Sequence, residues 1–401
     1  MAMETLESAL ALMLAQVQAM RETEDVTLSA ALGRVAAQDV LAPMQAPPFD
    51  RSPLDGYCLH SGDIAAASPE SPARLTVVGE ACAGCTERFH VPKGCALRVM
   101  TGAPVPPECD CVVRQEDTDE GMDTVGVFRP VGHGKNVCYA GEDVALGDCV
   151  LHRGEAVTAA HIGVLASLGV TRVTVYRRVR AVLLSTGDEL VQPGQPLTYG
   201  QIYDANRAVL TARLTELGAE AAVLDSAADE PEAVARLLEE AARSADVLIT
   251  TGGVSVGKKD IMHRVLPCMG ARQLFWKVAM KPGSPLLCGV YQEKLMICLS
   301  GNPFAALACF EVFAAPVLRK LAGQTEVSLR RGKGRLTGGF PKASPGRRLI
   351  RARCEGDCVR LTGSNHSSGS LSSMIGCNCL IDIPAGSGPL REGDEVEVIL
   401  L

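Results

Sequence analysis

The feature that most constrains the fold is a regular alternation of apolar runs and amphipathic segments in the middle of the chain. Continuous apolar runs at 181–184, 221–224 and 247–250 predict buried strands, because a strand covered on both faces needs no polar side. The segments between them, 206–217 and 231–243, predict helices. Strands and helices that alternate in units of about 30 residues are typical of a parallel sheet with helices on both faces.

The flanking regions follow other patterns. Short β runs between Gly- and Pro-containing turns predict two β domains, at about 75–150 and 326–401. Helices are expected at 3–20 and 158–168, and the sheet is expected to continue with strands near 274–280, 285–290 and 295–299 and a helix to about 321. A chain of 401 residues allows two to four domains. The predicted fold class is therefore α/β and multidomain.

Charge and hydropathy exclude some classes of protein. Lys and Arg number 39 against 46 Asp and Glu, and a net charge of −7 argues against binding nucleic acid over the whole surface. No run reaches the ~18 apolar residues of a membrane span, and no signal-peptide pattern is found, so we expect a cytoplasmic protein without membrane partners. The 16 cysteines are then expected to be reduced. Cys82 and Cys85 form the only C-x-x-C pair, and structural thiols are favoured over a zinc site because a second pair at suitable spacing is missing.

The loops that follow the predicted strands are rich in Gly, Ser and Thr. They cover 185–190, 250–257, 281–284 and 300–303. Ligands bind outside the carboxyl ends of the strands in an open parallel sheet, where backbone N–H groups and helix N-termini favour an anion such as phosphate. The loops match neither a Walker A motif nor a dinucleotide fingerprint. One such loop would be an ordinary tight turn, but four at one edge predict an anion site, with candidate residues Gly252, Gly253, Ser255, Ser300, Asn302 and Pro303.

Charged residues near these loops suggest what they would bind. Lys277 and Lys281 are four residues apart, so in one strand their side chains would lie on the same face and offer two cations to an anionic substrate. A solvent-exposed edge strand would account for the two lysines about as well. Glu189, Asp229 and Asp260 suit Mg²⁺, although each alone is more often a helix cap or a surface charge. The basic stretch 329–353 is expected to be mainly a solvated face. The seven histidines form no hydrolase pattern.

Three long motifs lie outside the α/β region: Pro-Phe-Asp-Arg-Ser-Pro-Leu-Asp-Gly-Tyr at 48–57, Met-Thr-Gly-Ala-Pro-Val-Pro at 100–106 and Ala-Gly-Glu-Asp-Val at 140–144. Together with the loops at 186–190, 251–257, 281–285 and 300–305, they resemble the molybdopterin molybdenumtransferase family, which includes MoeA and the gephyrin E domain. The resemblance covers essentially the whole chain, with the motifs in family order. It implies four domains: a helical dimerisation region (1–45 with 143–177), an inserted β domain (46–142), a three-layer α/β molybdopterin-binding domain (178–325) and a C-terminal β domain (326–401).

The resemblance also implies a reaction, in which molybdenum from molybdate enters adenylated molybdopterin near Mg²⁺ and AMP is released. It implies a homodimer with sites shared between subunits, and a separate protein that adenylates molybdopterin. The resemblance assigns catalytic roles to Glu189, Asp55, Thr101 and Asp143, metal binding to Glu189, Asp229 and Asp260, and substrate binding to Lys277, Lys281, Ser284 and Ser368.

Two positions depart from the family pattern: Ser284 stands where some relatives have a second lysine, and Arg51 stands where asparagine is common. The acids and the lysine pair are all present, so we expect an active enzyme. Two alternatives stay open at this point. One is a catalytically weak scaffold or binding paralogue that kept the fold, and the other is a paralogue that handles tungstate.

Overall fold

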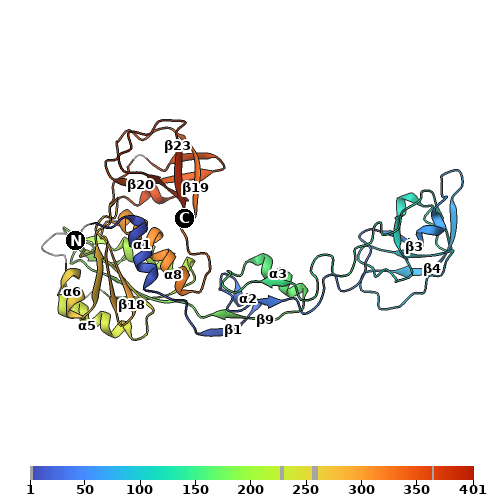
Figure 1. The fold of residues 1–401 in the computed structure, drawn as a ribbon, viewed down its shortest axis with the longest axis horizontal. Helices are drawn as coiled ribbons and strands as arrows, with labels where there is room; N and C mark the ends of the chain where they lie inside the picture. The colour runs from blue at the N-terminus through green and yellow to red at the C-terminus, as the bar shows by residue number, and fades with distance from the viewer. Residues whose placement is uncertain (1–2, 226–229, 255–260, 364) are drawn as a thin grey trace.

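The computed structural model describes residues 3–225, 230–254, 261–363 and 365–401, and it is elongated (Figure 1). An α/β domain and a C-terminal β domain lie together at one end. A β domain formed by the segment around β3 (Gly56–Leu59) and β4 (Ala73–Ala81) lies at the opposite end. A slender region around α2 (Leu28–Ala31) and α3 (Ala159–Ser167) connects the two ends. The predicted multidomain α/β fold class is confirmed.

The α/β domain contains a six-stranded sheet in the order β13-β10-β14-β18-β17-β15. The strands, in that order, are Glu220–Leu224, Arg180–Ser185, Val247–Thr251, Lys294–Leu299, Leu287–Tyr291 and Arg272–Trp276. The first four run parallel, but β17 is antiparallel to both of its neighbours, so a fully parallel sheet was a wrong prediction. The reason is a tight turn at Gln292 and Glu293, both with positive φ, which joins β17 to β18 as a hairpin. A parallel connection would need a dozen or more residues.

Helices cover both faces of this sheet, as predicted. Alternate strand residues divide between two apolar cores, with Leu183 and Ile249 in one and Leu184 and Leu248 in the other. The first core is closed by α1 (Leu6–Ala15), α4 (Ala205–Glu216), α7 (Pro303–Cys309), a π-helical turn (Phe310–Ala314) and α8 (Ala315–Leu321), and the second by α5 (Pro231–Ala242) and α6 (Met262–Cys268). The carboxyl ends of the parallel strands are thereby left open for a ligand.

The C-terminal domain is a closed sheet in the order β20-β21-β19-β23-β22, with β22 paired back to β20. These strands are Arg347–Glu355, Cys358–Leu361, Arg331–Thr337, Glu395–Leu400 and Cys379–Ile383, and a short 3-10 turn covers Ser372–Met374. Strand β16 (Met280–Lys281), which comes from the α/β part of the chain, pairs with β20. The α/β part of the chain is therefore joined to the C-terminal sheet by a short strand pairing at Met280 and Lys281.

The connecting region contains two antiparallel pairs, β1 (Thr23–Thr27) with β9 (Arg172–Tyr176) and β2 (Val40–Leu41) with β8 (Cys149–Leu151). Beyond it lies a five-stranded sheet in the order β6-β3-β5-β4-β7, in which β6 is Cys111–Arg114, β5 is Cys95–Val99 and β7 is Thr124–Val127. Apolar clusters cover both faces of this sheet, which gives the far domain cores of its own. The domain boundaries given above stay predictions. Among the described residues, no helix is long and apolar enough to cross a membrane.

Candidate functional site

Three loops meet at the carboxyl ends of β10, β14 and β18. The backbone N–H of Thr186 donates to the carbonyl of Thr251 (2.9 Å), and that of Gly252 donates to the carbonyl of Leu299 (3.1 Å). A cavity of about 580 Å³ opens over these loops. Its lining also contains Gly301 and Thr186, and it includes six predicted residues: Glu189, Gly252, Gly253, Ser300, Asn302 and Pro303. The predicted position of a ligand site at this edge therefore coincides with a cavity.

Gly252 allows the first two loops to approach closely. Its φ is +93°, and a Cβ added there would lie 2.4 Å from the carbonyl oxygen of Thr186, too close for any side chain. The loops thus pack through their backbones, which leaves N–H groups and hydroxyls to face the cavity.

Asn206 is a residue at this site that the sequence analysis missed. It lies in the first turn of α4, and its side-chain amide donates to Thr251 Oγ1 and to the carbonyl of Gly301, both at 2.8 Å. Thr251 Oγ1 in turn donates to the carbonyl of Ser300 (2.9 Å). The buried Oδ1 of Asn206 accepts no hydrogen bond in the described structure. Asn206 therefore fixes two loops and leaves a buried acceptor at the cavity.

The acid side chains of this cavity are Glu189 and Asp204. Glu189 is exposed and follows β10, whereas Asp204 caps α4 by accepting from the N–H of Arg207 (2.9 Å). Asp204 is a residue type that often begins a helix, so it was the feature of the sequence that could have marked the start of α4 and hence Asn206. Three predicted residues, Ser255, Asp229 and Asp260, lie outside the described residues. Glu189 is thus the member of the predicted metal set that the described structure places at the cavity.

A second cavity, of about 930 Å³, lies between the α/β domain and the C-terminal domain and shares Pro285, Ser300 and Asn302 with the first. The predicted residues Lys281, Ser284 and Ser368 line it. Lys342, which is exposed, and Arg348, which is half-buried, line it as well, so part of the basic stretch 329–353 lies at a cavity. Three cationic side chains at one cavity favour an anionic ligand.

Arg351 supports one wall of the second cavity from behind. It is fully buried and its guanidinium lies 3.9 Å from the ring centre of Phe304. Its two terminal nitrogens donate to three carbonyl groups of the loop that carries Ser368, those of Asn365, Ser367 and Ser370. Burial lowers the pKa of Arg351, yet arginine stays charged in proteins. The charge is thus balanced by backbone dipoles that hold the loop.

Lys277 does not share a strand with Lys281, so this part of the prediction is wrong. Strand β15 ends at Trp276, Lys277 has a φ of +75°, and Lys281 belongs to β16 in the other sheet. The ammonium of Lys277 lies 4.1 Å from the centre of the Trp276 ring. Among the described residues that line the two cavities, Lys281 is present and Lys277 is not. The strand ends here because the positive φ of Lys277 takes the backbone out of the extended conformation, although its N–H still donates to the carbonyl of Leu286 (2.9 Å).

The remaining predicted residues lie in other parts of the chain. Thr101 donates to one oxygen of Asp55 from both its N–H (2.7 Å) and its hydroxyl (2.8 Å), and these bonds lower the pKa of the Asp55 carboxyl. Asp55 directly precedes β3 and Thr101 follows β5, so both belong to the far β domain. Asp143 lines a separate cavity with Arg51. Within one chain, the structure does not bring these three residues to Glu189.

The comparisons with known proteins cover nearly the whole chain. Residues 4–169 match the profile described as MoeA N-terminal region (domain I and II), residues 182–320 match a probable molybdopterin binding domain, and residues 333–401 match MoeA C-terminal region (domain IV). The molybdopterin molybdenumtransferase of Staphylococcus aureus (strain MSSA476) is 34% identical over 379 residues, which is 94% of this chain and 90% of that protein. Molybdopterin molybdenumtransferase 2 of Mycobacterium tuberculosis is 35% identical over 93% of this chain and 94% of its own length.

Solved structures agree with these matches. The crystal structure of a molybdopterin biosynthesis MoeA protein from Pyrococcus horikoshii OT3 covers all of both chains with a TM-score of 0.85 and 28% identity. A second structure of the Pyrococcus MoeA protein gives a TM-score of 0.81 and 31% identity over 100% of this chain and 99% of that one. The similarity therefore extends over all domains and is not limited to the α/β domain.

Proposed function

This chain belongs to the molybdopterin molybdenumtransferase family, and on that premise we propose that it inserts molybdenum from molybdate into adenylated molybdopterin and releases AMP. The single observation that carries the proposal is the pair of confluent cavities at the carboxyl edge of the sheet, with Ser300 and Asn302 lining both. One cavity presents glycines and hydroxyls and the other presents three cationic side chains. Such linings suit a phosphorylated pterin and a second anion side by side.

The substrate would lie across both cavities. Backbone N–H groups near Gly253 and Gly301 would face phosphate oxygens, and Lys281, Arg348 and Lys342 would neutralise the remaining negative charge. Ser284, Ser300, Asn302 and Ser368 would add neutral hydrogen-bonding groups at the shared boundary. Because the first cavity lies at the ends of paired strands, the groups that line it would hold the phosphoanhydride of the substrate and the molybdate next to each other for reaction.

The oxygen-rich lining of the first cavity also fits Mg²⁺, which prefers carboxylates and retains several waters. Glu189, together with the predicted ligands Asp229 and Asp260, would hold the ion. When bound, Mg²⁺ would stabilise negative charge on the phosphates.

The test of this proposal is to supply adenylated molybdopterin, molybdate and Mg²⁺ and to measure AMP release. We expect Glu189→Ala to abolish release, and Glu240→Ala, an exposed change on α5 at the opposite face of the sheet, to leave it unchanged. Binding without release by the unaltered protein would contradict the proposal and favour the scaffold alternative. Release supported better by tungstate than by molybdate would favour the tungstate-handling alternative.

The position of Asp55 and Thr101 supports a site shared between two subunits of a homodimer. Asp55 directly precedes β3, and Thr101 follows β5 in the same sheet. The domain around β3 lies at the opposite end of the chain from the α/β domain (Figure 1), so these residues would act at the site of a partner. Mixing inactive Asp55→Ala and Lys281→Ala chains should restore part of the activity, because one site of each mixed dimer would be intact. No restoration in dimers verified to be mixed would show that each site is built from one chain.

Two further points stay predictions: a separate protein that adenylates molybdopterin, and a cytoplasmic location. A physical complex with the adenylating protein would be tested by co-purification.

A further inference from the structure

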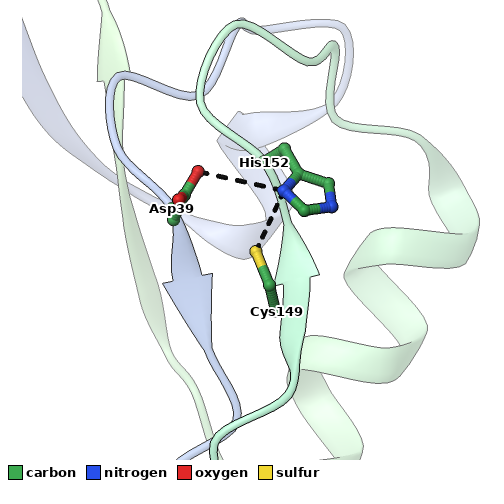
Figure 2. Close-up of side chains that lie close together, drawn as sticks. All are labelled: Asp39, Cys149 and His152. Carbon is green, nitrogen blue, oxygen red and sulfur yellow. Dashed lines mark hydrogen bonds and ion pairs between the residues drawn. The ribbon is translucent and has the colours of Figure 1, made fainter.

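A second group of potential ligands lies in the connecting region, away from both cavities. Asp39, Cys149 and His152 place one oxygen, one sulfur and one nitrogen within 4.8 Å of one another (Figure 2). Cys149 belongs to β8 and His152 follows it, whereas Asp39 precedes β2, the strand that pairs with β8. Among the described residues, this is the group of three such ligand atoms that the fold brings together.

The geometry argues against a nucleophilic Cys-His-Asp triad. In such a triad the acid and the nucleophile contact opposite nitrogens of the imidazole, so that a proton can pass through the ring. Here both partners face the same nitrogen: Cys149 Sγ lies 3.2 Å and Asp39 Oδ1 lies 4.0 Å from His152 Nδ1 (Figure 2). Three atoms that converge on one point are instead typical of a metal site.

We propose that Asp39, Cys149 and His152 bind a divalent metal ion of intermediate softness, with Zn²⁺ as the best match. Zn²⁺ accepts thiolate, imidazole and carboxylate ligands, and its tetrahedral geometry separates ligand atoms by about 3.3–3.7 Å. The two separations from His152 Nδ1, 3.2 and 4.0 Å, lie on either side of this range, and side-chain rotations would complete the fit. Water fills the fourth position.

Cys149 is fixed by its place in the paired strand β8, whereas Asp39 and His152 are more exposed and can adapt. The carboxylate of Asp39 accepts a hydrogen bond from the N–H of Arg153 (2.7 Å), which orients it toward His152. The side chains of His152 and Asp39 are 69% and 58% exposed, so they can rotate, and the ion can enter from solvent. The Cys149 thiol gives up its proton as the metal–sulfur bond forms, so one proton is released for each ion bound.

The position of the site gives it a structural role. Strands β2 and β8 are the two segments through which the chain enters and leaves the far β domain (Figure 1). An ion held by Asp39 on one segment and by Cys149 and His152 on the other links them side by side. Bound metal therefore restrains how the far domain is oriented.

The experiment uses the full-length protein stripped of metal under reducing conditions and titrated with Zn²⁺ and with Co²⁺. We expect one ion per chain, one proton released, and a thiolate-to-metal absorption band with Co²⁺. Cys149→Ser should weaken binding about 100-fold or more and remove that band. Amide hydrogen exchange around β2 and β8 should slow when Zn²⁺ binds.

Two control variants distinguish this site from other thiols. Cys268→Ser changes an exposed cysteine on α6, and the double variant Cys82→Ser/Cys85→Ser removes the C-x-x-C pair; both should retain full binding. If Cys149→Ser does not fold, Asp39→Asn keeps the acceptor for Arg153 while removing the charge, and it should weaken binding as well. The proposal is overturned by no binding of either ion, by binding that survives both ligand changes, or by binding that depends on Cys82 and Cys85.

Discussion

Arg351 provides the most demanding prediction about the candidate site, because it is buried and lines neither cavity in the described structure. Its guanidinium instead contacts Phe304 and the loop that carries Ser368. We predict that Arg351→Met loosens this loop. Methionine can occupy much of the space next to Phe304, but it donates no hydrogen bond. The carbonyl groups of Asn365, Ser367 and Ser370 then lose their shared partner.

The magnitude follows from two opposing contributions. Three hydrogen bonds to a charged group stabilise by about 1.5–3 kcal/mol each, and the contact with Phe304 adds roughly 2 kcal/mol. Against this, removing a buried charge relieves a desolvation cost of several kcal/mol. We expect a net loss of about 2 kcal/mol, which is roughly a 30-fold change in the population of the ordered loop.

The assays are urea denaturation, amide hydrogen exchange over residues 363–373, and steady-state kinetics. The loop should exchange faster, and KM for adenylated molybdopterin should rise more than kcat falls, because Arg351 positions a binding wall without facing the cavity. Arg353→Met is the matched control. Arg353 lies two residues along the same strand, pairs with Glu355 at the surface and should tolerate the change with a loss below about 0.5 kcal/mol. Unchanged exchange in Arg351→Met, or equal effects of the two variants, would refute the reasoning.

Two further predictions concern stability. Burial by itself would raise the pKa of Asp382, but hydrogen bonds from Arg347 and Arg331 outweigh it and lower the pKa. The ionised Asp382 side chain therefore contributes its full stabilisation at pH values above the ordinary carboxyl pKa, and this stabilisation is lost as the pH falls through the folded-state pKa. Asp382→Asn should lower the free energy of unfolding by about 3 kcal/mol at neutral pH and by progressively less below about pH 4, as measured by denaturation curves. A cost that does not change with pH would contradict this prediction. Gly283→Ala should destabilise by about 2 kcal/mol, because the new methyl would lie 2.2 Å from Cys309 Sγ at a φ of +89°. Thermal unfolding should show a smaller cost for Gly283→Ala when Cys309→Ala is already present, and equal costs would argue against the clash.

The α/β sheet could be predicted because its strands carry their own signal. The apolar runs that became β10 and β14 are buried on both faces, so their burial can be recognised from the local sequence alone. The run at 221–224 became the edge strand β13, whose residues are half-buried or exposed, so the prediction of a buried strand was wrong there. The cavity position followed from topology, since parallel strands bring their carboxyl ends to one edge. The antiparallel hairpin did not follow, because the turn at Gln292 and Glu293 contains none of the usual turn residues.

Residues that depend on tertiary contacts could not be predicted. Nothing local separates Arg351, which is buried against Phe304, from its exposed neighbours in the same basic stretch. Asn206 lies inside a helix and meets Thr251 only after folding. Cys149 comes close to Asp39 only because β2 pairs with β8, and the whole far β domain lies between these two strands in the sequence. A single sequence records which side chains are present, but contacts between distant segments depend on the complete fold.

The pairing of β2 with β8 has a consequence for the order of folding. Leu41 and Cys149 are register partners, and closing a flexible loop of roughly a hundred residues between them costs about 2 kcal/mol more than closing one of about ten. The far β domain has apolar cores of its own, so it can form first and bring its two ends together. The connecting region would then fold after the far β domain has formed. Mutations that slow folding of the far domain should therefore delay the pairing of β2 with β8.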